Sequence, residues 1–210
     1  MSNELDRFKA NMEDLFFGYA HITGAVEIYI LALENKNLQS AVSKSLFNKS
    51  QEWKTVHRFM IIDEVNIKWY PDLPTEMIAN QKKSLLGFLY GTYLGKMIAS
   101  VDLYFSSVLH SKTGQTSKSG SSWGDFSKNM KIDLLQCENG KDIFLWLQER
   151  HKIEHNNGRI DEFFVDKMLK KGVTHSYLSG DTIQKSHLDV LAAYNAIINF
   201  VIDVDNKVNV

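Results

Sequence analysis

The stretch LDRFKANMEDLFFGYAHITGAVEIYILAL, residues 5–33, decides the fold class of this chain. Its apolar residues recur at steps of three and four, which is the period of one face of an α-helix. The pattern predicts one long amphipathic helix that ends around residues 35–37. The residues on its apolar face are Leu5, Phe8, Met12, Leu15, Phe16, Tyr19, Ile22, Val26, Tyr29, Ile30 and Leu33.

The middle of the chain repeats the helical pattern between breaks. Apolar spacing continues more weakly over residues 38–69, which predicts one or two further helices, and no convincing strand run is present. Pro71 and Pro74 cannot donate backbone hydrogen bonds, so they separate this part from the C-terminal two thirds of the chain. Residues 82–110 are apolar around much of the circumference, as in the central helix of a bundle. Residues 111–122 lack apolar side chains and predict a flexible loop.

The last third of the sequence predicts three more helical segments. A short one covers residues 123–130, and a longer one runs from about Asp142 to His155, with Gly158 placed to cap it in left-handed geometry. The final helix begins near Ser186, which has an acidic residue at capping-box distance. Residues 172–183, between these helices, predict a turn or a short extended piece.

Composition sets the expected domain organisation and compartment. At 210 residues and 44% hydrophobic, the chain can bury one sizeable core, so we expect a single all-α domain over residues 1–210, with N-terminal helices in residues 1–70. The formal net charge of -1 gives no global positive field, so any site for a polyanion must be local. Cys137 is the only cysteine and the first residues lack a signal-peptide pattern, which predicts a reducing, cytoplasmic compartment.

Two apolar stretches, Leu15–Leu33 and Leu85–Val101, imitate membrane spans. The first contains His21 and Glu27, which are costly in hydrocarbon, and Lys96 interrupts the second. We interpret both as buried helices and expect no membrane partner. The second stretch also has a ridge of small residues that suits close helix packing: Gly87, Gly91, Gly95 and Ala99.

Polar residues suited to catalysis are concentrated in ERHKIEHNNG, residues 149–158. On a regular helix Arg150 and His155 lie about 140° apart in rotation and about 7.5 Å apart along the axis, so they do not share a face. A purely structural interpretation pairs Arg150 with Glu154 at i,i+4 and places His155 at the negative helix pole. His151 and His155 do share a face and could ligate zinc, but two ligands do not complete a site.

A functional interpretation combines the arginine with the histidines. A guanidinium holds phosphate through paired hydrogen bonds, and an imidazole moves protons to or from a ribose hydroxyl or a leaving oxygen. Arg150 and His155 are therefore sufficient for metal-free RNA cleavage if they are brought together. That requires either a distorted helix end or a second copy of the chain that completes the site.

The sequence around these residues resembles HEPN domains (higher eukaryotes and prokaryotes nucleotide-binding). The matching motif is Arg150, His151 and His155, followed by Asn156-Asn157-Gly158. The resemblance extends over about residues 82–205. It includes three further stretches: Ile98–Phe105, Trp123–Leu134 and Gly180–Ile183.

This resemblance implies an all-α helical bundle of HEPN type, here with a long N-terminal helix and a helical N-terminal extension. It further implies a homodimer whose two motifs form a composite endoribonuclease site without metal or cofactor, leaving a 2′,3′-cyclic phosphate on its RNA substrate. It also implies roles in toxin–antitoxin or phage-defence systems, with an antitoxin or nucleotidyltransferase as partner. The alternative is a non-catalytic helical module that binds protein, nucleotide or RNA.

The resemblance also assigns roles to individual residues. Arg150 would orient the scissile phosphate, His155 would act as general acid or base, and His151 would assist at the polar position. Asn156 would hydrogen-bond the substrate or fix His155. Two supporting candidates lie on the earlier helix: Asp102, which could orient Arg150, and Tyr104, whose structural interpretation is a core residue.

Overall fold

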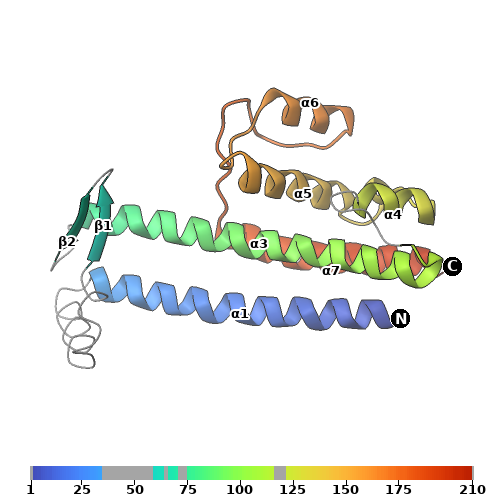
Figure 1. Ribbon diagram of the computed structural model, residues 1–210, viewed down its shortest axis with the longest axis horizontal. Coiled ribbons are helices and arrows are strands. Elements are labelled where there is room, and N and C mark those ends of the chain that lie inside the picture. Colours follow the sequence, from blue (N-terminus) through green and yellow to red (C-terminus); the bar gives the residue numbers. More distant parts are fainter. Residues whose placement is uncertain (1, 35–58, 64–65, 71–74, 116–121, 210) are drawn as a thin grey trace. The chain divides into compact units, whose positions relative to one another are not determined.

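A computed structural model describes residues 2–34, 59–63, 66–70, 75–115 and 122–209 of this chain. Figure 1 shows that the described chain is predominantly helical. Its helices are α1 (Asn3–Glu34), α3 (Thr75–Thr113), α4 (Ser122–Met130), the 3-10 helix η1 (Leu134–Gln136), α5 (Gly140–His155), α6 (Glu162–Lys170) and α7 (His187–Val208). The all-α fold class expected from the sequence is confirmed.

Most helix ends lie close to the expected positions, and α3 is the main exception. It begins at Thr75 rather than Lys82 and continues to Thr113, so the first residues of the predicted loop are helical. Residues 116–121 of that loop and the two prolines lie outside the described residues. The helix α7 begins as predicted, because Ser186 and Asp189 form a reciprocal capping box.

A small β-hairpin interrupts the helical pattern. Strands β1 (Phe59–Asp63) and β2 (Asn66–Tyr70) pair antiparallel, with Phe59 opposite Tyr70 and Asp63 opposite Asn66. The prediction of helix here, and of no strand, is wrong. Both runs are short and rich in isoleucine and aromatic residues, and apolar spacing alone does not separate a short strand from a helical turn. Residues 35–58, also predicted helical, lie outside the described residues.

The chain divides into two compact units. One comprises Met1–Tyr19 and Gly87–Val210, and the other comprises Ala20–Leu86. This boundary differs from the expected division at residues 70–82, because the first nineteen residues belong with the C-terminal helices. All residues of the expected site lie in the larger unit, and the expectation of a single domain stays a prediction.

Helix α7 supplies the core of the larger unit. Its fully buried apolar residues are Val190, Ala193, Ile197, Phe200, Val201 and Val204. In Figure 1 α7 runs alongside α1 and α3, and ring contacts join Phe16 to Tyr194 and Phe105 to Phe200. Each large side chain buried in this way contributes roughly 1.5–3 kcal/mol. By length and composition α7 is also the one helix in the described part of the chain that could cross a membrane.

A second core cluster supports the end of α5. Phe164 and Met168 of α6 pack with Phe144, Ile160, Val173 and Ile183, and all are nearly inaccessible. Helix α6 was not predicted from the sequence. Its signal was present, because Asp161 caps the helix by accepting from the Phe164 N–H and two apolar residues occur at i,i+4 spacing. This cluster fixes where the α5 end and the turn after it lie.

Candidate functional site

Arg150 is held by carboxylates from two helices. Its Nε donates to Oε1 of Glu154 at 2.8 Å, which is the expected i,i+4 pair, and its Nη1 donates to Oδ2 of Asp102 at 3.2 Å. Asp102 lies on α3, 48 positions earlier in the sequence. The other carboxylate oxygen of Asp102 accepts from the hydroxyl of Ser122 on α4. The guanidinium is therefore oriented by contacts that join α3, α4 and α5.

These bonds use only part of the hydrogen-bonding capacity of Arg150. A guanidinium has five N–H donors, and the two contacts to carboxylates use two of them. The side chain is 25% exposed, so the remaining donors are partly open to solvent. The carboxylates of Asp102 and Glu154 keep the guanidinium in place beside the cleft that it lines.

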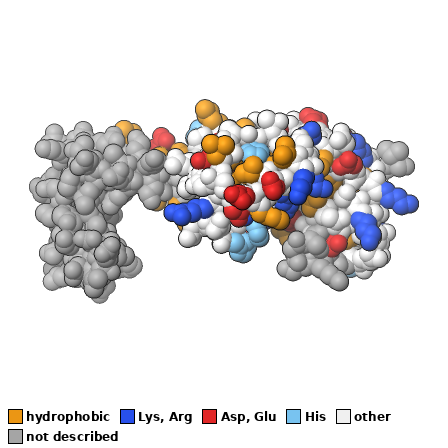
Figure 2. Space-filling model, turned by 90° about the horizontal axis from the view of Figure 1, so that it is seen from above, with side chains coloured by type: hydrophobic (Ala, Val, Ile, Leu, Met, Phe, Trp, Pro, Cys, Tyr) orange, Lys and Arg blue, Asp and Glu red, His pale blue; other side chains and the backbone are white. Residues whose placement is uncertain are grey.

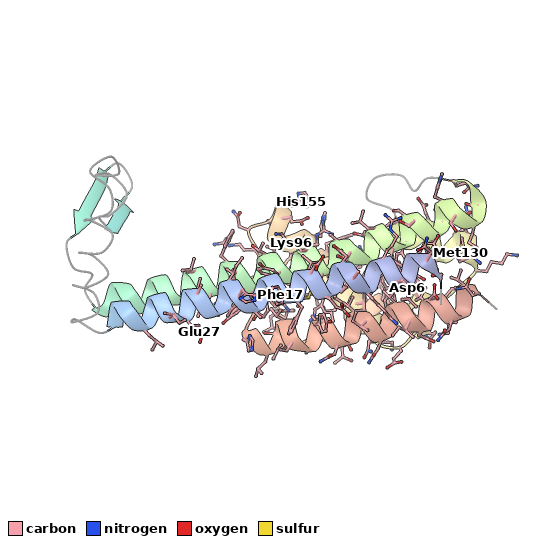
Figure 3. The ribbon with its side chains drawn as sticks, turned by 90° about the horizontal axis from the view of Figure 1, so that it is seen from below. Asp6, Phe17, Glu27, Lys96, Met130 and His155 are labelled. Carbon is pink, nitrogen blue, oxygen red and sulfur yellow. The ribbon has the colours of Figure 1, made fainter. Side chains whose placement is uncertain are left out.

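His151 and His155 form a pair on the neighbouring face of α5. Their ring centroids are 4.7 Å apart, and both residues are exposed. Figure 3 shows His155 at the outer edge of the molecule. Among the described residues, neither imidazole has a hydrogen bond or ion pair, with Arg150 or with any other side chain.

The geometry of α5 excludes one of the two ways of combining these groups. The helix is regular through His155, so the suggestion that its end is distorted is wrong. Arg150 and His155 therefore stay about 140° apart in rotation, as the sequence predicts for a regular helix. Within one chain the structure brings Arg150 to Asp102, and His151 to His155, as two adjacent groups.

Asn156 closes the helix. Its N–H and that of Gly158 both donate to the carbonyl of Lys152 at 2.9 Å, and its side-chain Nδ2 donates to the carbonyl of Arg159 at 2.8 Å. Gly158 has φ of 73°, the left-handed conformation predicted from the sequence. The amide nitrogen of Asn156 thus holds the turn after His155.

Tyr104 lies apart from this cluster. It is 3% exposed, and its hydroxyl donates to Oδ1 of Asp205 on α7 at 3.0 Å. Burial, together with the charge of Asp205, raises the pKa of Tyr104 well above the ordinary value. Its expected supporting role at the site is not what the structure shows: the side chain joins α3 to α7 in the core.

A buried ion pair includes Glu149, the residue before Arg150 on α5, and this pair was not predicted from the sequence. Glu149 is 1% exposed; its Oε1 accepts from the Tyr177 hydroxyl at 2.7 Å, and its Oε2 lies 2.5 Å from Nζ of Lys185 as an ion pair without an aligned hydrogen bond. The position had a signal, because Glu149 is four residues from both Leu145 and Ile153 on the apolar side of the helix. Burial and the Glu149 charge raise the pKa of Tyr177.

A cleft of about 440 Å³ lies beside Arg150. Its floor is the small-residue ridge of α3, and Ile153 and Lys185 also line it. A Cβ added to Gly87 or Gly91 would meet no atom of the described chain within 4 Å. The ridge is therefore open at Gly87 and Gly91, where close helix packing was expected, whereas Gly95 lies against the Arg150 side chain.

Charge and metal-ligand patterns around the site are modest. Figure 2 shows acidic and basic side chains interspersed on the face drawn there, without a large patch of one sign. No group of three or more His, Cys, Asp and Glu side chains that could hold a metal occurs in the described part of the chain. The site thus offers an oriented guanidinium, a pair of open imidazoles and an adjacent cleft.

Comparison with protein-family models, with curated proteins and with solved structures gave no match for this chain.

Proposed function

We propose that this protein is a HEPN-type endoribonuclease that cleaves RNA without metal at a site shared by two copies of the chain. The observation that carries the proposal is Arg150, oriented by two carboxylates with donors to spare, one face away from the exposed pair of His151 and His155. The proposal includes a cytoplasmic protein in a toxin–antitoxin or phage-defence system, restrained by an antitoxin or a nucleotidyltransferase partner.

The chemistry needs one phosphate-binding group and one proton-transfer group. A base removes the proton of the ribose 2′-hydroxyl, the oxygen attacks phosphorus, and the bond to the 5′-oxygen breaks. The leaving oxygen takes a proton from an acid, and a 2′,3′-cyclic phosphate remains. Imidazoles from the two copies, those of His155 with His151 assisting, would act as base and acid. Arg150 would bind the non-bridging oxygens, where charge increases in the transition state.

The regular course of α5 is the reason for proposing two copies. Arg150 and His155 of one chain face different directions, so a second α5 placed across the first would bring the histidines of one copy to the arginine of the other. The open cleft beside Arg150 gives an RNA strand room to approach the same guanidinium.

The test is incubation of purified protein with total cellular RNA and tRNA in EDTA, followed by end-group analysis of the fragments. Wild type should cleave and leave cyclic-phosphate ends, whereas His155→Ala and Arg150→Lys should not. Arg150→Lys keeps the charge but cannot bind two carboxylates and a phosphate with one planar group. The matched controls are His110→Ala and Arg7→Ala, which replace exposed residues outside the cluster and should cleave like wild type. Intact RNA with the wild-type protein contradicts the proposal.

A non-catalytic helical module is the second candidate. The observation that favours it is the same set of bonds, because Asp102 joins Arg150 of α5 to Ser122 of α4 and thereby ties three helices together. In that case Arg150→Lys lowers the thermal stability or the dimerisation of the protein, and wild type leaves RNA intact. Unfolding midpoints and analytical ultracentrifugation of the same variants distinguish the two candidates.

A further inference from the structure

The pair of histidines at the end of α5 has the sequence spacing and ring proximity of a chelating pair. Two histidines at i,i+4 on one helix face are a recurrent arrangement for binding zinc. Here the rings of His151 and His155 are 4.7 Å apart at their centroids, inclined by 54°, and both are exposed. No described side chain hydrogen-bonds to either ring, so the nitrogen lone pairs are not already committed within the described chain.

The surrounding charges favour a cation at this position. His155 is the last residue of α5, where the helix dipole is negative. The two neighbouring basic groups on α5 are each paired with carboxylates: Arg150 with Asp102 and Glu154, and Lys152 with Asp161. Over the last two turns of α5, a dication approaching the imidazoles therefore meets only basic side chains that are already paired with carboxylates.

We propose that His151 and His155 chelate a late first-row divalent cation of the Zn²⁺ class, and that this ion switches the protein off as a ribonuclease. Water would complete the coordination, since the described chain supplies two ligands. Imidazole suits Zn²⁺ and Cu²⁺, whereas Mg²⁺ and Ca²⁺ prefer oxygen ligands and should not bind. The inhibitory part rests on the proposed function, because a metal on His155 takes the lone pair that proton transfer needs.

Binding is tested independently of RNA, by isothermal titration calorimetry with ZnCl₂ and the full-length, EDTA-treated and dialysed protein. A site with two of the four ligands of a structural zinc site should bind with a dissociation constant on the order of 1–200 µM. His151→Gln and His155→Gln should each weaken binding at least about tenfold, because one ligand alone does not chelate. His110→Ala should bind like wild type, and MgCl₂ should give no binding.

Glutamine is chosen because it is a good helix former, and circular dichroism confirms that the variants fold. The binding proposal is overturned if wild type binds no Zn²⁺ more tightly than about 1 mM, or if affinity is unchanged in both glutamine variants. Binding by wild type that is lost in both variants supports it, whatever the protein does to RNA.

The regulatory part is tested by measuring the RNA cleavage rate in EDTA, and again at a free Zn²⁺ concentration of about ten times the measured dissociation constant. About nine-tenths of the sites are then occupied, so the cleavage rate should fall about tenfold and recover on adding EDTA. An unchanged rate with the site occupied overturns the switch while leaving the metal site intact. Absence of cleavage already in EDTA contradicts the proposed ribonuclease itself, and with it the switch, but not the calorimetric result.

Discussion

Replacing Lys185 by methionine should strongly destabilise the protein, because it leaves the carboxylate of Glu149 buried without its cation. Glu149 is 1% exposed and the Lys185 side chain is 6% exposed, so solvent cannot substitute for the lost partner. The Tyr177 hydroxyl remains as one hydrogen-bond donor to the carboxylate. Removing one member of a buried pair typically costs about 3–5 kcal/mol. For a chain of this size each kcal/mol lowers the unfolding midpoint by roughly 2–4 °C, so a fall of about 6–20 °C is expected.

The double variant Glu149→Gln/Lys185→Met isolates the cause. Glutamine removes the buried charge but keeps an oxygen that can accept from Tyr177, so the double variant should recover at least about half of the lost stability. The matched control is Lys152→Met, which breaks the ion pair with Asp161. The Asp161 side chain is 45% exposed, and losing such a pair should cost less than about 1 kcal/mol.

The measurement is thermal and urea unfolding followed by far-ultraviolet circular dichroism, for wild type, both single variants and the double variant. If Lys185→Met is no less stable than Lys152→Met, an unpaired Glu149 carboxylate does not destabilise the protein. If the double variant is as unstable as Lys185→Met, the unpaired charge is not the cause of the instability.

Three further outcomes are expected. Gly140→Ala should lower stability by several kcal/mol or prevent folding, because the new Cβ would lie 2.0 Å from a backbone oxygen of η1. Gly124→Ala, whose Cβ would meet nothing within 4 Å, should stabilise α4 by about 0.5–1 kcal/mol, and thermal unfolding of both variants compares the two effects. The raised pKa of Tyr104 keeps its phenol protonated in the native state at a pH where the unfolded phenol ionises, so its stabilisation is complete below about pH 10 and falls by roughly 1.4 kcal/mol per pH unit above it. Urea unfolding between about pH 9 and 11 should show a shallower loss of stability for Tyr104→Phe than for wild type, and an equal loss would contradict the raised pKa. Ser186→Ala removes the α7 cap and should cost about 1 kcal/mol, measured by urea unfolding, with no change counting against the cap.

Local rules predicted much of the helical fold and part of the site. The cap at Ser186, the left-handed Gly158 and the i,i+4 pair of Arg150 with Glu154 all depend on residues within a few positions of one another, and each is present. The predicted α3 was too short at its C-terminal end, because its last turn is polar and an apolar pattern cannot show where such a turn ends.

Contacts between residues far apart in the sequence could be proposed from residue types, but the sequence did not show which of them form. Asp102 was a candidate to orient Arg150, and the structure puts the two in contact across 48 positions. Tyr104 stood beside it as a candidate, yet two positions along a helix rotate a side chain by about 200°, and it faces Asp205 in the core. The partners of Glu149 lie 28 and 36 positions away, on a segment with no periodicity of its own.

Sequence patterns alone predict that this chain is mainly helical, where several helices start and stop, and that Arg150 and His155 do not share a helix face. Those features arise from backbone geometry and from contacts one helical turn apart. Other features became visible in the folded chain: the β-hairpin, the burial of Glu149 with Lys185, the open glycine ridge and the contacts of Arg150 with α3 and α4. Those features depend on which distant surfaces pack together, and the free energy of that packing is not encoded in the spacing of neighbouring residues.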